Sequence, residues 1–147
     1  MTTPQVSLRH TIATLAYRAN ATFKGAPAAF AATTAGGGTR TAVEVLAHMG
    51  DLLDWAFSLA TGAEVWNDST PLPWSEEVAR FHKALIRLDL HVRDASELKA
   101  PAARIFQGAI ADAIWHTGQL ALLRRLAGSP IESENYAEAL IAEGKLA

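Results

Sequence analysis

Hydrophobic residues recur along most of this chain at spacings of three and four, which is the period of an α-helix. Such spacing places side chains on one side of a helix, where they can be buried against a neighbour. In residues 4–24 one face of this kind is formed by Leu8, Ile12, Leu15, Ala19 and Phe23. We therefore predict a first helix here, followed by a loop at the glycine run of residues 36–38.

A second helix is predicted by its start signal. Thr41 is followed three residues later by Glu44, a spacing at which each side chain can accept a hydrogen bond from the other residue's backbone amide. Apolar residues then keep the helical period as far as Gly62. The polar residues 67–73 include two prolines and break the pattern, after which a third amphipathic helix is predicted over residues 74–92.

The fourth helix is predicted between two prolines. Pro101 suits a first turn, where an amide hydrogen would be unpaired, and the pattern ends at Gly128 with Pro130 beyond it. From Ser133 onward a few apolar residues again have helical spacing, which leaves room for a short fifth helix. Helices with one apolar stripe each bury those stripes best against one another. We predict an all-α fold, a four-helix bundle in which residues 1–147 form a single domain.

The amino-acid composition limits which binding partners and metal ligands are expected. Half of the residues are hydrophobic, mostly the strong helix formers Ala and Leu. The 13 Lys and Arg residues face 15 Asp and Glu residues without a basic patch, and no apolar run is long enough to span a bilayer, so neither nucleic acid nor a membrane is an expected partner. There is no cysteine, so a metal ion would rely on His and carboxylate ligands. No targeting segment is recognised, and we expect a cytoplasmic protein.

Polar residues interrupt the apolar stripes of the second and fourth helices. His116 projects near the middle of the core-facing side of its helix, with Asp112 one turn earlier and Gln119 at the edge of the stripe. His48 projects to the flank of the apolar face of the second helix. Because side chains one turn apart can share an ion, His48, Asp112 and His116 are candidate metal ligands. Asp51, one turn from His48, and Gln119 are candidates for orienting the two rings.

A more ordinary interpretation stands beside this one. An Asp and a His four residues apart can simply form an ion pair. The other histidines are weaker candidates: His10 projects to the solvent side of the first helix, while His82 and His91 flank the stripe of the third. His82 with Asp89, two turns on, is a reserve ligand pair.

Two segments of the chain resemble the DinB-like superfamily: V-L-A-H-M-G-D-L-L-D-W at residues 45–55 and A-I-W-H-T-G-Q-L-A-L-L-R-R-L-A-G-S-P-I at residues 113–131. The order and spacing of the helices extend the resemblance over residues 4–131. The superfamily includes thiol-dependent transferases such as the bacillithiol transferases, and it is related to the mycothiol-dependent maleylpyruvate isomerases. The resemblance therefore implies a helical bundle with a metal-dependent active site.

The resemblance also implies a ligand set. In the superfamily one ligand comes from the second helix and two come from an H-x-x-x-H motif on the last, and these positions correspond to His48, Asp112 and His116. Asp112 departs from the pattern, because the usual residue there is His. Two imidazoles and one carboxylate still suit Zn²⁺, the expected ion, and also Ni²⁺ or Fe²⁺.

Three protein ligands leave coordination positions open, as in catalytic metal sites. We expect a metal-dependent enzyme acting on a small molecule, either a transferase with a low-molecular-weight thiol as co-substrate or a hydrolase, with a pocket shaped by residues 36–40 and 61–73. The alternative is a non-catalytic dimeric bundle in which the same three residues form a structural polar network. A homodimer is expected, with Trp115 at its contact or at the mouth of the pocket.

Overall fold

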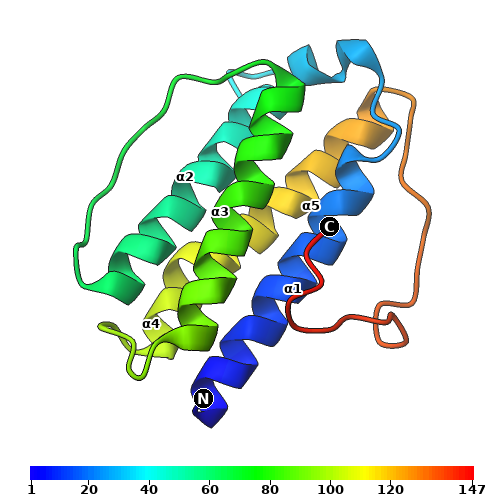
Figure 1. Ribbon diagram of the computed structural model, residues 1–147. Helices are drawn as coiled ribbons and strands as arrows, with labels where there is room; N and C mark the ends of the chain where they lie inside the picture. Colours follow the sequence, from blue (N-terminus) through cyan, green and yellow to red (C-terminus); the bar gives the residue numbers. More distant parts are fainter.

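The computed structural model describes residues 1–147 and consists of four helical rods without a strand (Figure 1). The elements in chain order are α1 (Thr3–Phe23), the short 3₁₀ helix η1 (Ala28–Ala32), α2 (Ala42–Thr61), α3 (Trp74–Asp94), α4 (Ala102–Ile105), the π-helical turn η2 (Phe106–Ile110) and α5 (Ala111–Leu126). The last three follow one another without a break and form the fourth rod. The predicted all-α four-helix bundle is confirmed.

The rods pack in a square. α2 lies beside α3 and α5, and α1 lies beside the same two helices, so α1 and α2 are diagonal to each other. The apolar faces predicted from the sequence meet in the middle. The largest fully buried side chains are those of Ile12, Leu15, Phe30, Leu46, Met49, Leu53, Phe81, Leu85, Leu88, Ile105, Ile110 and Leu120.

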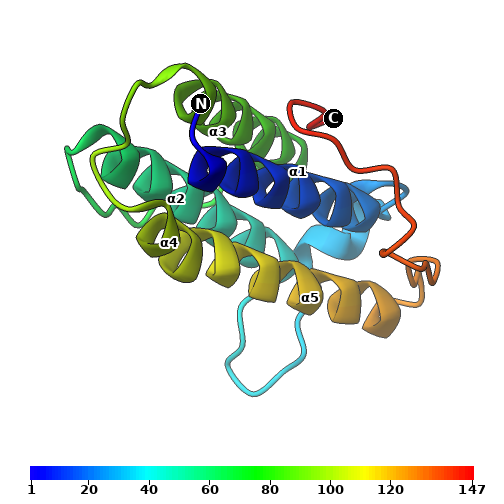
Figure 2. The ribbon, with the colours of Figure 1, turned by 90° about the horizontal axis from the view of Figure 1, so that it is seen from below.

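The ends of α2 follow the local sequence signals. The Thr41 hydroxyl accepts a hydrogen bond from the Glu44 amide, and the Glu44 carboxylate accepts one from the Thr41 amide, 2.7 Å away. At the other end Gly62 has φ +81°, a left-handed conformation that glycine adopts without strain and that ends a helix. Before α2, the glycine-rich loop of residues 33–41 projects from the side of the bundle formed by α2 and α5 (Figure 2).

The fourth rod contains the π turn where the sequence predicts a regular helix. A π turn inserts one residue into the helical period, so the faces before and after it are offset by about 100°. This turn ends at Ile110, immediately before the helix that carries Asp112 and His116.

Residues 127–147 form turns and extended chain rather than a fifth helix. A helix this short is marginal on its own in water. Ile141 and Leu146 pack against the core from this non-helical chain, while Leu140 is 87% exposed. The segment instead folds back along α1, where the Tyr17 hydroxyl bonds Glu134 and Asn20 donates to the carbonyl of Leu146. None of the helices combines the length and the apolar character needed to cross a membrane.

Candidate metal centre

The three predicted ligands come together between α2 and α5. His48 lies in the second turn of α2, and Asp112 and His116 lie one turn apart at the start of α5. One nitrogen or oxygen atom from each residue lies within 4.8 Å of the other two. The cluster therefore offers two imidazole nitrogens and a carboxylate, a group that can hold a metal ion.

The spacing of these atoms is informative. Asp112 Oδ2 lies 3.7 Å from His48 Nε2, and Asp112 Oδ1 lies 3.5 Å from His116 Nε2. Hydrogen bonds of this kind are about 2.7–3.2 Å long. Two ligands bound at about 2.0–2.1 Å to one tetrahedral ion are separated by roughly 3.3–3.4 Å. Both separations exceed a hydrogen bond and lie within ion-pair distance, so they fit a histidine–carboxylate ion pair as well as a set of ligands that would draw closer around an ion.

Gln119 sets the protonation pattern of the His116 ring. The His116 Nδ1 atom lies 2.6 Å from the Gln119 side-chain oxygen, which can only accept a hydrogen bond. With the amide oxygen as acceptor, Nδ1 is the donor in this contact, and Nε2 faces the Asp112 carboxylate. An outer partner on the remote ring nitrogen is the usual way in which proteins orient a metal-binding histidine.

The His48 ring is held by two aromatic neighbours. It stands perpendicular to the His116 ring, at a centroid distance of 4.7 Å, and packs edge-on against Trp66 at 5.6 Å. Burial lowers the pKa of His48 below its usual value, and the charges of Arg40 and His116 lower it further against the opposing charge of Asp112. The neutral ring, which is the form that binds a metal, is therefore favoured.

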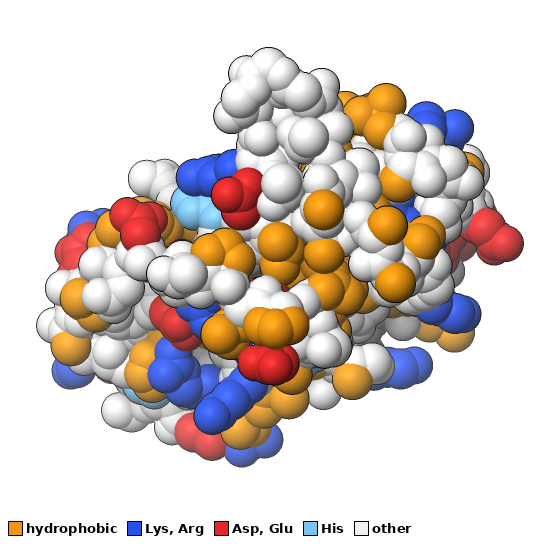
Figure 3. Space-filling view, turned by 90° about the horizontal axis from the view of Figure 1, so that it is seen from above, with side chains coloured by type: hydrophobic (Ala, Val, Ile, Leu, Met, Phe, Trp, Pro, Cys, Tyr) orange, Lys and Arg blue, Asp and Glu red, His pale blue; other side chains and the backbone are white.

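The cluster is shielded on one side and open on the other. The side chains of His48 and His116 are 15% and 10% exposed, whereas that of Asp112 is 46% exposed. A cavity of about 180 Å³ beside His48 is lined by residues of both predicted loops, including Arg40 and Asp68. On the face drawn in Figure 3, histidine atoms reach the surface between basic and acidic side chains.

Gly108 in the π turn makes room for Trp55, one of two tryptophans that pack near His48. A Cβ atom at this position would lie 3.2 Å from the Trp55 ring, so the glycine lets α2 approach closely. Trp55 in turn stands perpendicular to Trp66, which covers His48. Trp66 was not a sequence candidate, because nothing in the pattern of its loop places it over α2.

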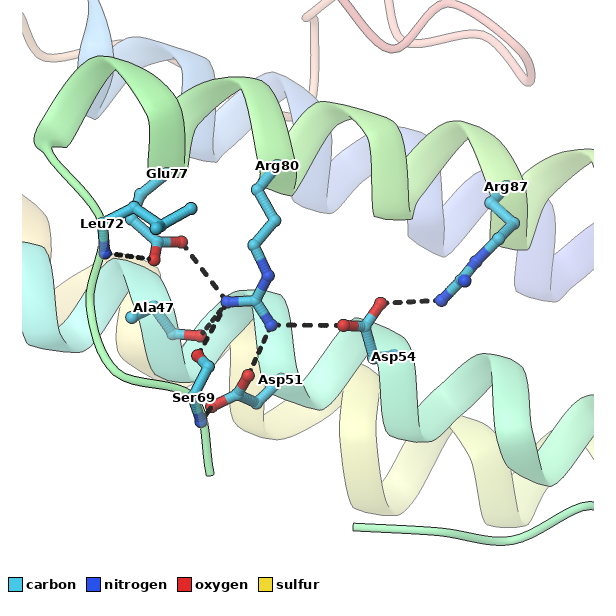
Figure 4. Close-up of polar contacts among 8 residues, drawn as sticks. All are labelled: Ala47, Asp51, Asp54, Ser69, Leu72, Glu77, Arg80 and Arg87. Atoms are coloured by element: carbon cyan, nitrogen blue, oxygen red, sulfur yellow. Dashed lines mark hydrogen bonds and ion pairs between the residues drawn. The ribbon is translucent and has the colours of Figure 1, made fainter. Parts of the chain in front are cut away.

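Asp51 has partners other than His48. Its carboxylate accepts hydrogen bonds from Arg80 of α3 and from the amide of Ser69, and no hydrogen bond joins it to the His48 ring. Arg80 reaches from α3 into a group of acceptors on α2 and on the loop of residues 62–73 (Figure 4). Besides Asp51, these are the side chains of Asp54 and Ser69 and the carbonyl of Ala47; Glu77, one turn earlier on α3, also accepts a hydrogen bond from Arg80.

Arg80 is a residue that sequence reasoning missed. Burial acts to lower its pKa, but the hydrogen bonds and charges of Asp51, Asp54 and Glu77 outweigh this and raise it. Glu77 projects to the edge of the apolar stripe of α3 and could have indicated a buried carboxylate that requires a cation, whereas Asp51 projects away from the stripe of α2 and gave no such signal. Through Ser69, Arg80 holds the loop that carries Trp66 against the metal centre.

The remaining histidines do not join the centre. His10 lies 3.5 Å from Glu143 at the surface, and His91 is near the carbonyl of Ala60. The reserve pair is not formed, because His82 bonds Asn20, whereas Asp89 forms a buried ion pair with Arg9. The second histidine-carboxylate group considered from the sequence is thus excluded by the packing of α3 against α1.

The donor atoms define what this site can do. Two imidazoles and a carboxylate suit Zn²⁺, Ni²⁺ or Fe²⁺, and three protein ligands would leave coordination positions free for another molecule. Comparison with protein-family models, curated proteins and solved structures finds no match for this chain, so the interpretation of the centre rests on its geometry.

Proposed function

We propose that the protein is a divalent-metal-dependent enzyme whose ion is held by His48, Asp112 and His116. The observation that supports this most directly is the presentation of His116 Nε2 and His48 Nε2 to one carboxylate at 3.5 and 3.7 Å, with the Nδ1 proton of His116 donated to Gln119. Zn²⁺ is the proposed ion, with Ni²⁺ and Fe²⁺ as the alternatives that this donor set admits.

The proposed chemistry follows from the open side of the centre. When bound, a divalent ion supplies a Lewis acid that stabilises a thiolate or a hydroxide at neutral pH. Gln119 keeps the His116 lone pair directed at the centre, and Trp66 excludes water from the face of His48. The DinB-like resemblance favours transfer of a low-molecular-weight thiol to a small electrophile over hydrolysis.

A homodimer belongs to the same proposal. Trp115, Leu122 and Leu126 lie on one face of α5 and are 73%, 53% and 58% exposed, an apolar stripe that a second copy would cover. The competing function is a non-catalytic dimer in which the metal centre is only a polar network. That function is supported by the ion-pair distances between Asp112 and the two histidines, and metal binding distinguishes it from the proposed enzyme.

Metal binding tests the proposal. Metal-free protein is titrated with Zn²⁺, Ni²⁺ and anaerobic Fe²⁺ by calorimetry, and the bound metal is counted by elemental analysis. We expect one ion per chain for the wild type and for the control His10→Ala, which removes an exposed histidine elsewhere. We expect the affinity to fall at least about a hundredfold in His48→Ala and His116→Ala, because each removes a ligand.

Two results would contradict the proposal in different ways. If the wild type binds clearly less than one ion per chain with every metal tested, the enzyme hypothesis is wrong. Full-affinity binding by His116→Ala, with circular dichroism showing an intact fold, would show that the ion is held by other residues.

A further inference from the structure

A second and larger cavity lies next to the metal centre. It has a volume of about 460 Å³ and lies between the loop of residues 35–40 and α5. Its apolar wall is formed by Val45, Leu122 and Leu123, and its one charged side chain is that of Arg40. The cavity therefore combines a hydrocarbon surface with a single cation, which is the complement of a small organic anion.

Two contacts join this cavity to the metal centre. Gln119 lines the cavity and also accepts the hydrogen bond from the His116 ring. Arg40 lines both this cavity and the smaller one beside His48, so its side chain lies at the boundary of the two. A molecule in the larger cavity would thus lie beside Arg40 and contact Gln119, the hydrogen-bond partner of His116.

The Arg40 guanidinium forms no contact that stabilises the fold. It is exposed and has no carboxylate within ion-pair distance and no hydrogen bond to another residue. The carboxylate of its neighbour Glu44 is already bonded to the amide and hydroxyl of Thr41. The arginines that do pair with carboxylates are Arg9, Arg80, Arg87, Arg93 and Arg104.

We propose that this cavity binds a small monocarboxylate with an apolar body, its carboxylate on Arg40 and its hydrocarbon part on Val45, Leu122 and Leu123. A guanidinium can hold a carboxylate through two parallel hydrogen bonds, and one cation matches one negative charge. This inference rests on the proposed function, because it names the substrate class that the metal centre would receive.

Binding of hexanoate and of its uncharged analogue hexanamide tests the inference. Each is titrated into ¹⁵N-labelled, metal-free protein and into Zn²⁺-loaded protein, and dissociation constants are obtained from amide chemical shifts. Because Leu122 also belongs to the proposed dimer face, the protein concentration is fixed where light scattering shows one oligomeric species. The variants are Arg40→Met and the control Arg125→Met, which removes an exposed cation from the last turn of α5 that lines neither cavity.

We expect the wild type and Arg125→Met to bind hexanoate at least about fivefold more tightly than hexanamide, the effect of one partly exposed charge-assisted contact. In Arg40→Met this preference disappears, and hexanoate binds about as weakly as hexanamide. The largest shifts in the wild type fall on the amides of residues 35–40 and 119–123. Equal hexanoate affinity in Arg40→Met and the wild type, or shifts confined to another surface, would overturn the inference.

The same titrations separate this inference from the proposed function. If hexanoate binds only to Zn²⁺-loaded protein and Arg40→Met has no effect, the metal holds the carboxylate, so the cavity assignment fails and the metal centre stands. If the Arg40-dependent preference is present in metal-free protein that also fails to take up any metal, the cavity assignment stands and the enzyme hypothesis fails.

Discussion

Arg80→Met is expected to destabilise the bundle far more than the same substitution at Arg87. Arg80 bonds the buried carboxylates of Asp51 and Glu77, which are 5% and 1% exposed, and its own side chain is 21% exposed. Arg87 lies two turns away on the same helix and bonds only Asp54, with the two side chains 47% and 41% exposed. The two variants therefore remove the same charge from a buried and from an exposed ion pair.

The expected magnitude follows from what remains after the substitution. Breaking a buried pair costs about 3–5 kcal/mol, because a charge is left without its partner. Here each carboxylate keeps one backbone donor, Ser69 for Asp51 and Leu72 for Glu77, and water reaches part of the Arg80 site. We therefore expect a loss of about 2–4 kcal/mol for Arg80→Met and of about 0.5 kcal/mol or less for Arg87→Met.

Urea denaturation followed by circular dichroism measures the difference. For a chain of this length, about 3 °C of melting temperature corresponds to 1 kcal/mol, so Arg80→Met should melt about 6–12 °C below the wild type. The loop with Trp66 should also loosen, which would change tryptophan fluorescence before the global transition. If Arg80→Met loses no more stability than Arg87→Met, the reasoning from buried carboxylates is wrong.

Three further predictions concern other parts of the fold. Gly118→Ala should raise the free energy of unfolding in urea by about 0.5–1 kcal/mol, because a Cβ there meets nothing within 4 Å. Gly108→Ala should raise it less, because its Cβ would lie 3.2 Å from the Trp55 ring. Equal increases would show that α2 does not depend on a glycine at position 108. Burial lowers the pKa of His82 from 6.5, so His82 takes up a proton more readily in the unfolded chain. Stability therefore falls as the pH drops below about 6.5, by up to about 1.4 kcal/mol per pH unit. His82→Gln should lose less stability than the wild type between pH 7 and pH 5, and parallel stability profiles would refute this. Trp115→Ser should shift the protein toward the monomer in light scattering without lowering its melting temperature at low concentration, and an unchanged mass would place any dimer contact elsewhere.

The fold was predictable because its signals are local. The helical period, the capping pair Thr41 and Glu44, and the positive-φ Gly62 each act within a few residues, and the structure uses all of them. His48, Asp112 and His116 were predictable for the same reason, since a projection of one helix shows that a polar side chain interrupts an apolar stripe. His48 meets Asp112 and His116 because α2 and α5 are neighbours in the bundle.

Residues on loops could not be found in this way. Arg40 and Trp66 lie beside the centre because residues 33–41 and 62–73 return to α2 and α5, and no periodicity describes such a path. The π turn before Asp112 also escapes a projection that assumes 100° per residue. The sequence thus indicates which residues line the bundle interior, while the shape of the opening depends on tertiary contacts.

Asp112 and Arg40 together determine which ligands the open side would favour. Around a divalent ion, two neutral imidazoles and one carboxylate leave a net charge of +1, whereas three imidazoles would leave +2. The Asp112 carboxylate would thus weaken the attraction of the centre for an anion. Its side chain is 46% exposed, so it would act where a ligand can approach from solvent. Arg40 supplies a positive charge beside the cavity that His48 lines, and it is free of any ion pair. In the proposed enzyme, part of the charge that selects an anionic substrate would therefore lie on Arg40 rather than on the metal, and a ligand long enough to reach both would be favoured.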